Sequence, residues 1–297
     1  MRLLTPLLVT SLTALLLACG ADEPIGPERY AGSDALVTTM KANVSAADSL
    51  TEVIDIDHSR LGSEVGSTMP PARVLIFSEP QLESELIAIS PLLALDLPLR
   101  ALAYESAPGA GSSVSYNSFD YLVSRYQLDA VQTANLRAAY DGAMSAAIGD
   151  IDRKNLTAFA DDSMQPDGII TINSPYDFAE TLARVNAAID SQGDTVRFGS
   201  VDFQANAKSL GIDLPHSHMI LFGGPGPGGK AMADAVTLGL DGFCQKFLIW
   251  EDSNGQINLS FNDLLALADR QEVPKRLALR VINYRLNSVF SEALSGQ

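Results

Sequence analysis

The stretch VLIFSEP at residues 74–80 has a counterpart 145 positions further along the chain, MILFGGP at residues 219–225. Other segments repeat in the same order: Ile56–Asp57 with Val201–Asp202, Pro70 with Pro215, LALDLP (93–98) with LGLDGF (238–243), LAYES (102–106) with LIWED (248–252), and SYN (115–117) with SFN (260–262). The LAYES pair is displaced by one residue more than the others, because the second copy carries an insertion there. Similarity at one period over this length predicts two copies of one fold.

The second copy shows its expected elements most clearly. Phe178, Leu182, Val185 and Ile189 have helical spacing, and Asn254-Gly255 is typical of a hairpin turn. The expected strands are 168–172, 194–202, 216–222, 245–250 and 256–261, and the expected helices are 178–189, 204–210, 229–238, 262–270 and 274–293. One hairpin among several helices favours the α+β class. Each copy is predicted to be a two-layer α/β repeat with a mixed, largely antiparallel sheet, and the two are expected to pack as an internal pseudo-dimer.

The N-terminus predicts export. Arg2, an apolar run to Leu17 and the small residue Ala18 before Cys19 form a secretory signal that is too short to span a membrane. The segment LLAC resembles the lipobox of bacterial lipoproteins, which implies a lipid on Cys19, and the following Gly20 does not indicate inner-membrane retention. We therefore expect a protein that is lipid-anchored in the bacterial cell envelope, at the outer membrane and facing the periplasm.

These signals divide the chain. The predicted parts are a lipoprotein signal peptide (1–18), a lipidated tether (19–33), a first repeat (34–150), a linker (151–167) and a second repeat (168–297). The first repeat has no counterpart of strand 168–172, because residues 24–27 are poor strand formers and are expected to belong to the tether. A helix at 135–148 is expected to close the first repeat.

Composition limits the partners. The chain has 36 acidic and 20 basic side chains, so a surface of net charge −16 is expected to repel nucleic acid and anionic lipid headgroups. An apolar content of 46% indicates a packed globular protein. Cys244 is the one cysteine besides Cys19, so no intramolecular disulfide is expected, and Cys244 is interpreted as a buried, inert thiol.

A glycine-rich stretch raises the question of a nucleotide. Residues 224–230, GPGPGGK, have the spacing of a phosphate-binding loop. Pro225 and Pro227 remove two backbone donors, however, and Ala231 stands where a Mg²⁺-binding hydroxyl is needed. The first copy has Glu79 at the position of Gly224. The sequence therefore predicts no nucleotide site and no cofactor.

The repeated segments also resemble a known family. IDIDHS (54–59), LIFSEP (75–80), LDLPLRALAYE (95–105) and SYN (115–117), with their second-copy partners, look like the family called domain of unknown function 302. The resemblance covers nearly all of the mature chain as a tandem pair. It implies a compact α+β domain in each copy and leaves the activity open.

Asp57 and His58 form the most chemical-looking pair. His58 could act as an acid, a base or a ligand, because histidine titrates near neutrality. Neighbouring strand residues point to opposite faces, so the two do not form a dyad by themselves. The structural alternative is that they cap the following helix. In the second copy Asp202 remains, and Phe203 replaces the histidine.

Three polar positions recur in both copies, as Asp96 and Asp241, Glu105 and Glu251, and Asn117 and Asn262. Glu105 and Asn117 are expected to converge on one edge of the sheet. Carboxylates beside an amide could bind a cation or polar ligand, or act in acid–base chemistry. Alternatively, Asp96 forms a turn and the two asparagines are helix N-caps.

His216 and His218 alternate on a predicted strand and could form a pair of metal ligands, although no third ligand is evident.

Three functions follow from these observations. The first is a non-enzymatic envelope lipoprotein that binds a small molecule or an envelope protein partner. The second is a hydrolase or isomerase with one site in the first repeat, which uses His58 with Asp57, Glu105 or Asn117. The third is a periplasmic metal-binding protein that uses His216 and His218.

Overall fold

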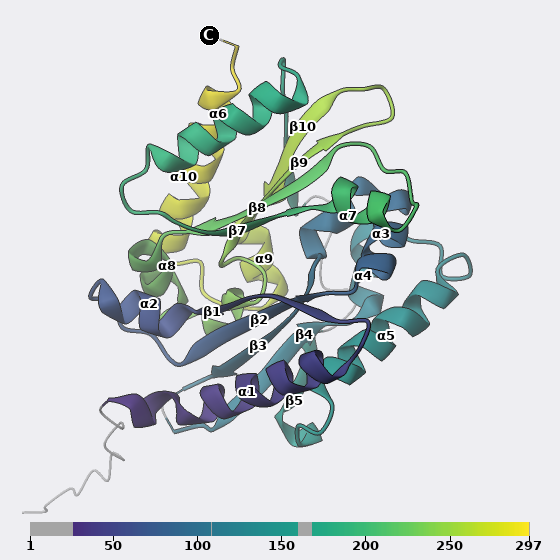
Figure 1. Ribbon diagram of the computed structural model, residues 1–297. Coiled ribbons are helices and arrows are strands. Elements are labelled where there is room, and N and C mark those ends of the chain that lie inside the picture. The colour runs from purple at the N-terminus through teal and green to yellow at the C-terminus, as the bar shows by residue number, and fades with distance from the viewer. Residues whose placement is uncertain (1–25, 108, 160–167, 297) are drawn as a thin grey trace, which may run out of the picture.

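The computed structural model describes residues 26–107, 109–159 and 168–296, and Figure 1 shows that they form two stacked sheets with helices between and outside them. The signal peptide and Cys19 lie outside the described residues. In the described part of the chain, no helix is both long and apolar enough to cross a membrane.

The first sheet has five strands in the order β1-β2-β3-β4-β5. Their bounds are β1 Thr51–Asp57, β2 Ala72–Ser78, β3 Leu99–Glu105, β4 Ser112–Asn117 and β5 Leu156–Phe159. Neighbouring strands are antiparallel, except that β5 runs parallel to β4. Residues from the expected linker therefore provide an edge strand of the first sheet.

The second sheet repeats this arrangement in the order β6-β10-β9-β8-β7, and all its pairs are antiparallel. The strands are β6 Ile169–Asn173, β7 Val196–Asp202, β8 Ser217–Gly223, β9 Gln245–Glu251 and β10 Ile257–Asn262. β6 lies on the edge that β5 occupies in the first sheet, so each repeat completes the same edge with a different piece of chain.

Helices connect the strands. The first repeat has η1 Pro27–Tyr30, α1 Ala31–Ala46, α2 His58–Glu64, α3 Pro80–Ile89, η2 Pro91–Asp96, α4 Phe119–Tyr126, α5 Ala134–Ile148 and η3 Arg153–Asn155, where η denotes a 3₁₀ helix. The second has α6 Phe178–Asp190, α7 Phe203–Ser209, α8 Pro225–Met232, η4 Val236–Gly239, α9 Leu264–Arg270 and α10 Leu277–Ala293. Residues 27–33, which were expected to be tether, form η1 and the start of α1.

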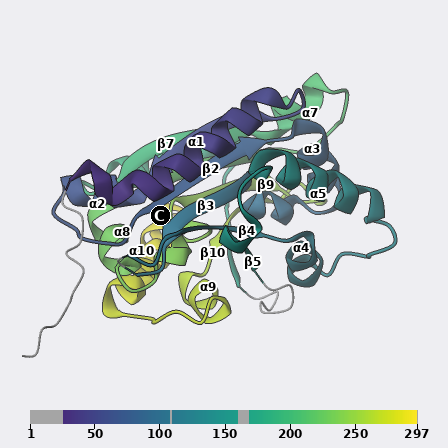
Figure 2. The same cartoon turned by 90° about the horizontal axis from the view of Figure 1, so that it is seen from below.

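Apolar packing fixes the outer helices on the two sheets. Figure 2 shows α1 running alongside β2 and β3 of the first sheet, and α1 contacts both strands. On the far side of the second sheet, Phe290 of α10 packs edge-on against Phe247 of β9, with ring centroids 4.3 Å apart, and Phe247 also packs against Phe222 of β8. All three phenylalanines are fully buried.

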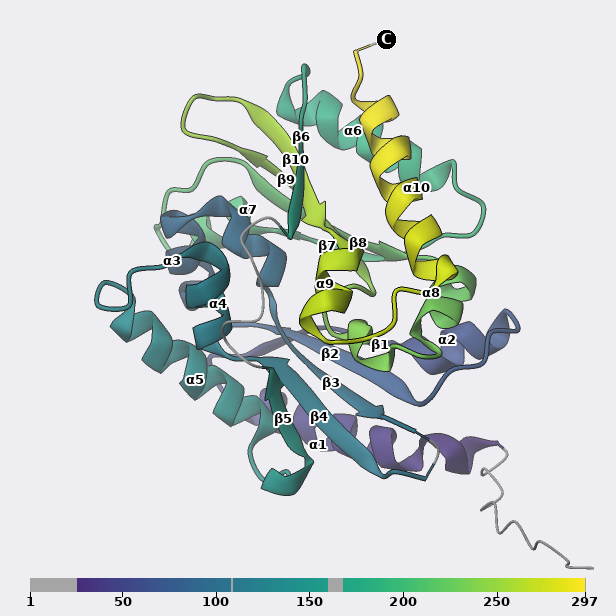
Figure 3. The ribbon, with the colours of Figure 1, turned by 180° about the vertical axis from the view of Figure 1, so that it is seen from behind.

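The inner helices hold the two repeats together in a reciprocal way. α2 packs against α8, and α3, the counterpart of α8, packs against α7, the counterpart of α2. Likewise η2 lies on β8 and β9, and η4 lies on β2 and β3. Figure 3 shows α2 and α8 side by side, at the opposite end of the interface from α3 and α7. The predicted α+β pseudo-dimer is confirmed.

The glycine-rich stretch belongs to this interface. The expected helix at 229–238 is wrong in its bounds, because α8 starts at Pro225 and ends at Met232, and a separate 3₁₀ turn follows. Proline fits the first helical position, where its missing N–H costs nothing. A Cβ on Gly229 would lie 2.8 Å from Cβ of Ser67, and the Ser67 hydroxyl donates to the carbonyl of Gly226 at 2.8 Å. Glycine at 229 thus permits the close approach of α8 to the first repeat.

Candidate functional site

Two buried polar clusters cross the boundary between the repeats. In one, Arg125 of the first repeat donates to Asp96 Oδ2 at 2.7 Å and to Asn262 Oδ1 of the second repeat at 2.6 Å. Asp96 also accepts from the hydroxyl of Tyr126 at 2.6 Å. The arginine that pairs with an aspartate in one repeat therefore also donates a hydrogen bond to an asparagine of the other repeat.

The second cluster is the counterpart with the repeats exchanged. Arg270 donates to Asp241 Oδ2 at 2.8 Å and to Asn117 Oδ1 of the first repeat at 2.5 Å. Asn117 Nδ2 donates in turn to Asp241 Oδ1 at 2.9 Å. The guanidinium of Arg270 also lies over the ring of Tyr121, 3.7 Å from its centroid.

The burial of both clusters indicates that their role is structural. The six main side chains are at most 6% exposed. Burial works against ionisation of Asp96, but the charges of Arg125 and Arg100 outweigh it and hold the pKa of Asp96 below its usual value. Buried charges of this kind are tolerated when they are paired and hydrogen-bonded. We conclude that Asp96, Asp241, Asn117 and Asn262 hold the repeats together.

Two expectations about these residues are wrong. Asn117 and Asn262 are not helix N-caps, because Ser118 and Asp263, one position later, accept the capping hydrogen bonds. Glu105 and Asn117 do not converge on one edge. In an antiparallel hairpin the end of the first strand meets the start of the second, so Glu105 pairs with Ser112, and Asn117 lies at the far end.

His58 is also part of the interface. It is 6% exposed, and its Nε2–H donates to the carbonyl of Gly239 in η4, at 3.1 Å. Burial lowers the pKa of His58 to about 4, against the opposing effects of this hydrogen bond and of Asp57. The structure does not bring His58 together with Glu105 or Asn117.

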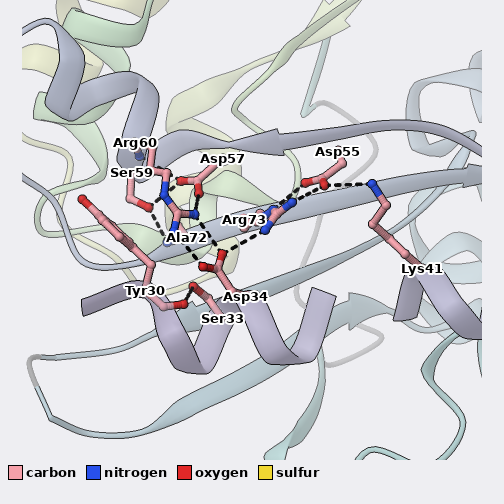
Figure 4. Close-up of polar contacts among 10 residues, drawn as sticks. All are labelled: Tyr30, Ser33, Asp34, Lys41, Asp55, Asp57, Ser59, Arg60, Ala72 and Arg73. Atoms are coloured by element: carbon pink, nitrogen blue, oxygen red, sulfur yellow. Dashed lines mark hydrogen bonds and ion pairs between the residues drawn. The ribbon is translucent and has the colours of Figure 1, made fainter. Parts of the chain in front are cut away.

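Asp57 caps α2 and joins an ionic network on the first repeat, shown in Figure 4. Arg60 contacts Asp57 at 2.5 Å and Asp34 of α1 at 2.7 Å, and Arg73 of β2 contacts Asp34 and Asp55. The hydrogen bond from Arg60 is the main reason why the pKa of Asp34 is lowered. The network ties α1 to β1 and β2. Asp202 caps α7 in the same way as Asp57 caps α2, but Ala205 replaces Arg60 there.

Two of the candidate residues, His216 and Glu251, line one open cleft at the end of the second sheet, with a volume of about 440 Å³. Ligand pockets commonly have volumes of this order. The rest of the lining comes from Ser174–Phe178 and Gly255–Ile257. The ring of His216 stacks on Phe178, with centroids 4.2 Å apart, and among the described residues its buried Nδ1 has no hydrogen-bond partner.

The equivalent place in the first repeat is filled. There Glu105, the counterpart of Glu251, accepts a hydrogen bond from the hydroxyl of Ser112 at 3.2 Å. Gly32 of α1 packs so closely that a Cβ on it would lie 2.2 Å from that hydroxyl. In the second repeat Ile257 replaces Ser112, and the Glu251 carboxylate has no hydrogen-bond or ion-pair partner in the described part of the chain. The two repeats therefore differ at this cleft.

His216 and His218 have different surroundings. His218 lies in β8 opposite Asp202, and burial lowers its pKa, whereas His216 precedes the strand and stacks on Phe178. The described residues contain no group of three His, Cys, Asp or Glu side chains that could hold a metal ion. Burial raises the pKa of the Cys244 thiol to about 12, so this thiol is protonated at neutral pH.

Arg125 and Arg270 were not among the candidate residues predicted from the sequence, although they are 145 positions apart like the other repeated residues. It also missed Tyr176 and Asp177, which line the cleft from the segment before α6. The shared spacing of the two arginines was a usable signal, whereas no sequence pattern marked Tyr176 or Asp177.

Comparisons with known proteins agree with the duplicated fold. Residues 29–147 and 170–292 each match the family described as domain of unknown function DUF302, and the chain belongs to that family. A solved structure titled "Crystal structure of uncharacterized conserved protein DUF302 from Bacillus stearothermophilus" is similar at 13% identity and a TM-score of 0.36, over 43% of this chain and 97% of that chain.

Curated proteins that share a similar segment are named as fluoride-specific ion channels. "Fluoride-specific ion channel FluC 1" of Brucella suis biovar 1 (strain 1330) is 41% identical over 106 residues, which cover 36% of this chain and 41% of that protein. "Fluoride-specific ion channel FluC 2" of Brucella melitensis biotype 1 is also 41% identical over 106 residues, 36% of this chain and 38% of that protein. The chain spans about two fifths of the length of these relatives.

Proposed function

We propose that this protein is a non-enzymatic binding module of the bacterial cell envelope, tethered to a membrane by a lipid on Cys19, which takes a small ligand in the cleft of its second repeat. The observation that carries the proposal is the difference between the repeats. One place in the fold is closed by Gly32 and Ser112 in the first repeat and is open in the second, where the Glu251 carboxylate has no partner among the residues that the structure describes.

The other two functions have less support from the geometry. The enzyme hypothesis needs His58 to act with Asp57, Glu105 or Asn117. His58 contacts Gly239, however, and Asp57 caps α2 and contacts Arg60. Asn117 contacts Asp241 and Arg270. The metal hypothesis needs His216 and His218 to share a ligand, yet they differ in surroundings and no third ligand lies with them among the described residues. Binding requires neither arrangement.

A thermal-unfolding screen of the mature chain tests the binding proposal. The compounds are organic amines, neutral sugars, carboxylates, metal ions and fluoride, the last because of the names of the Brucella relatives. A compound that binds the native state raises the melting temperature. The matched variants are Ile257→Ser, which restores the first repeat's hydroxyl beside Glu251, and Glu105→Gln at the closed equivalent. Binding in the cleft is expected to be weakened by Ile257→Ser and unaffected by Glu105→Gln. The proposal is wrong if no compound stabilises the protein, or if Ile257→Ser leaves every stabilisation unchanged.

The anchor has a separate test. Cells that express the full chain are labelled with radioactive palmitate, and the membrane and soluble fractions are compared for the natural chain and Cys19→Ala. We expect the label and the membrane association to be lost together in the variant. An unlabelled natural chain, or a variant that keeps the label, would rule out lipidation at Cys19.

A further inference from the structure

We infer that the cleft of the second repeat binds the ammonium end of an organic amine, an inference that rests on the proposed binding function. Among the described residues, the side chains that line the cleft include two carboxylates, those of Asp177 and Glu251, and no lysine or arginine. A cationic ligand is favoured by this lining, whereas an anionic one is repelled.

The unpaired Glu251 carboxylate points to a ligand that donates hydrogen bonds. In the first repeat the equivalent carboxylate, that of Glu105, accepts a hydrogen bond from the hydroxyl of Ser112. The second repeat has the carboxylate without the donor, because position 257 is isoleucine. An ammonium group carries three donors and no acceptor, and its hydrogen bonds to a carboxylate are charge-assisted. It therefore supplies what the second repeat lacks.

Asp177 adds a second negative charge. Its Oδ1 accepts the backbone N–H of Glu180 at 2.8 Å as the N-cap of α6, so the carboxylate is held in place at the cleft that it lines. The cap fixes the orientation of the side chain and leaves the other oxygen for a ligand.

The aromatic side chains suit the same class of ligand. The guanidinium of Arg184 lies 3.9 Å from the centroid of the Tyr176 ring, so one face of this ring already packs against a cation of the protein itself. Phe178 and His216, stacked at an interplanar angle of 10°, provide a flat wall for an alkyl chain. The cleft thus combines carboxylates for an ammonium group with apolar surface for the carbon chain that bears it.

Two other surface hollows of similar size lack this combination. One is lined by two carboxylates, those of Asp202 and Asp213, and also by Lys208, so a cation of the protein itself already lies beside them. The other is lined by Arg153 and by no carboxylate. The cleft of the second repeat is the best match for a cation among these three.

Isothermal titration calorimetry of the mature chain tests the inference with butane-1,4-diamine and its neutral counterpart butane-1,4-diol. We expect the diamine to bind at least about tenfold more tightly than the diol, since a hydrogen bond to a charged group is worth a factor of that size. Glu251→Gln should weaken diamine binding by about tenfold or more. Glu105→Gln, at the closed equivalent, should leave it unchanged. Circular dichroism melting checks that both variants are folded.

The outcomes separate this inference from the proposed function. Equal affinity for diamine and diol, undetectable diamine binding, or a Glu251→Gln variant that binds the diamine normally would overturn the ammonium assignment. If the diamine fails while a sugar or carboxylate from the screen binds and is lost in Ile257→Ser, the cleft is a ligand site for another chemical class. If no compound depends on the cleft, both proposals fail.

Discussion

Replacing His58 by glutamine is expected to change the pH dependence of stability by about 3 kcal/mol. His58 is buried against Gly239 with its pKa lowered from 6.5 to about 4. A group whose pKa is lower in the folded state than in the unfolded state binds more protons when unfolded. The stability that it contributes is therefore present above pH 6.5 and is lost as the pH falls to 4. At about 1.4 kcal/mol per pKa unit, the shift corresponds to about 3 kcal/mol. Glutamine does not titrate and can still donate to the Gly239 carbonyl.

Urea unfolding followed by the fluorescence of Trp250, the one tryptophan of the chain, measures this difference. The free energy of unfolding is determined for the natural chain and for His58→Gln at several pH values from 7.5 to 4. The natural chain should lose about 3 kcal/mol relative to the variant over this range. Subtracting the two curves cancels the titration of all other groups. A difference that stays constant within about 1 kcal/mol would show that His58 is not held neutral by the interface.

Three further predictions concern other buried groups and use the same unfolding measurement. Burial raises the pKa of Glu83 to about 7. The free energy of unfolding of the natural chain should therefore fall by about 3 kcal/mol relative to Glu83→Gln as the pH rises from 4.5 to 7, which is opposite in sign to the effect of His58. A change of the same sign as for His58 would contradict this prediction. Lys246 is 4% exposed and its Nζ has no partner among the described residues, so Lys246→Met should raise the free energy of unfolding by about 1 kcal/mol or more, whereas a loss would show that the amine is satisfied. Asp241→Asn removes a carboxylate that pairs with the buried charge of Arg270 and should lower the free energy of unfolding by about 3 kcal/mol or more. Asp213→Asn, on the surface, should lower it by at most about 0.5 kcal/mol. Equal losses for the two variants would show that the buried cluster does not stabilise the fold.

Much of the fold could be predicted because its signals are local. The strands and helices of the second repeat follow from apolar spacing and turn residues, and the period of 145 residues transfers them to the first repeat. The bounds of α8 were missed because proline and glycine are poor helix formers, yet Pro225 suits a helix start and the glycines are needed for packing on α2.

The asparagines and aspartates repeated at the interface were found from the sequence, but their roles were not. Asn117 contacts Asp241 across 124 positions of sequence, and this contact exists only because the two repeats pack together. No local pattern encodes such packing. The cleft was missed for a related reason. Glu105 and Glu251 are equivalent in sequence. They differ in the neighbour on the next strand, which is Ser112 for Glu105 and Ile257 for Glu251, and in the position of the preceding helix, α1 or α6.

The crossed clusters, in which each asparagine completes the other repeat's aspartate and arginine, also bear on how the chain could have arisen. Two identical single-repeat molecules could form the arginine–asparagine contact twice in a twofold homodimer, since this contact has its exchanged counterpart. In such a homodimer every substitution would appear twice, and both clefts would be open or both closed. Joining the two copies in one polypeptide removes that restriction. One half is then free to fill its cleft with Ser112 and Gly32 while the other keeps a half-buried carboxylate in an open cleft. The covalent link thus lets the two halves diverge in sequence although they stay packed together.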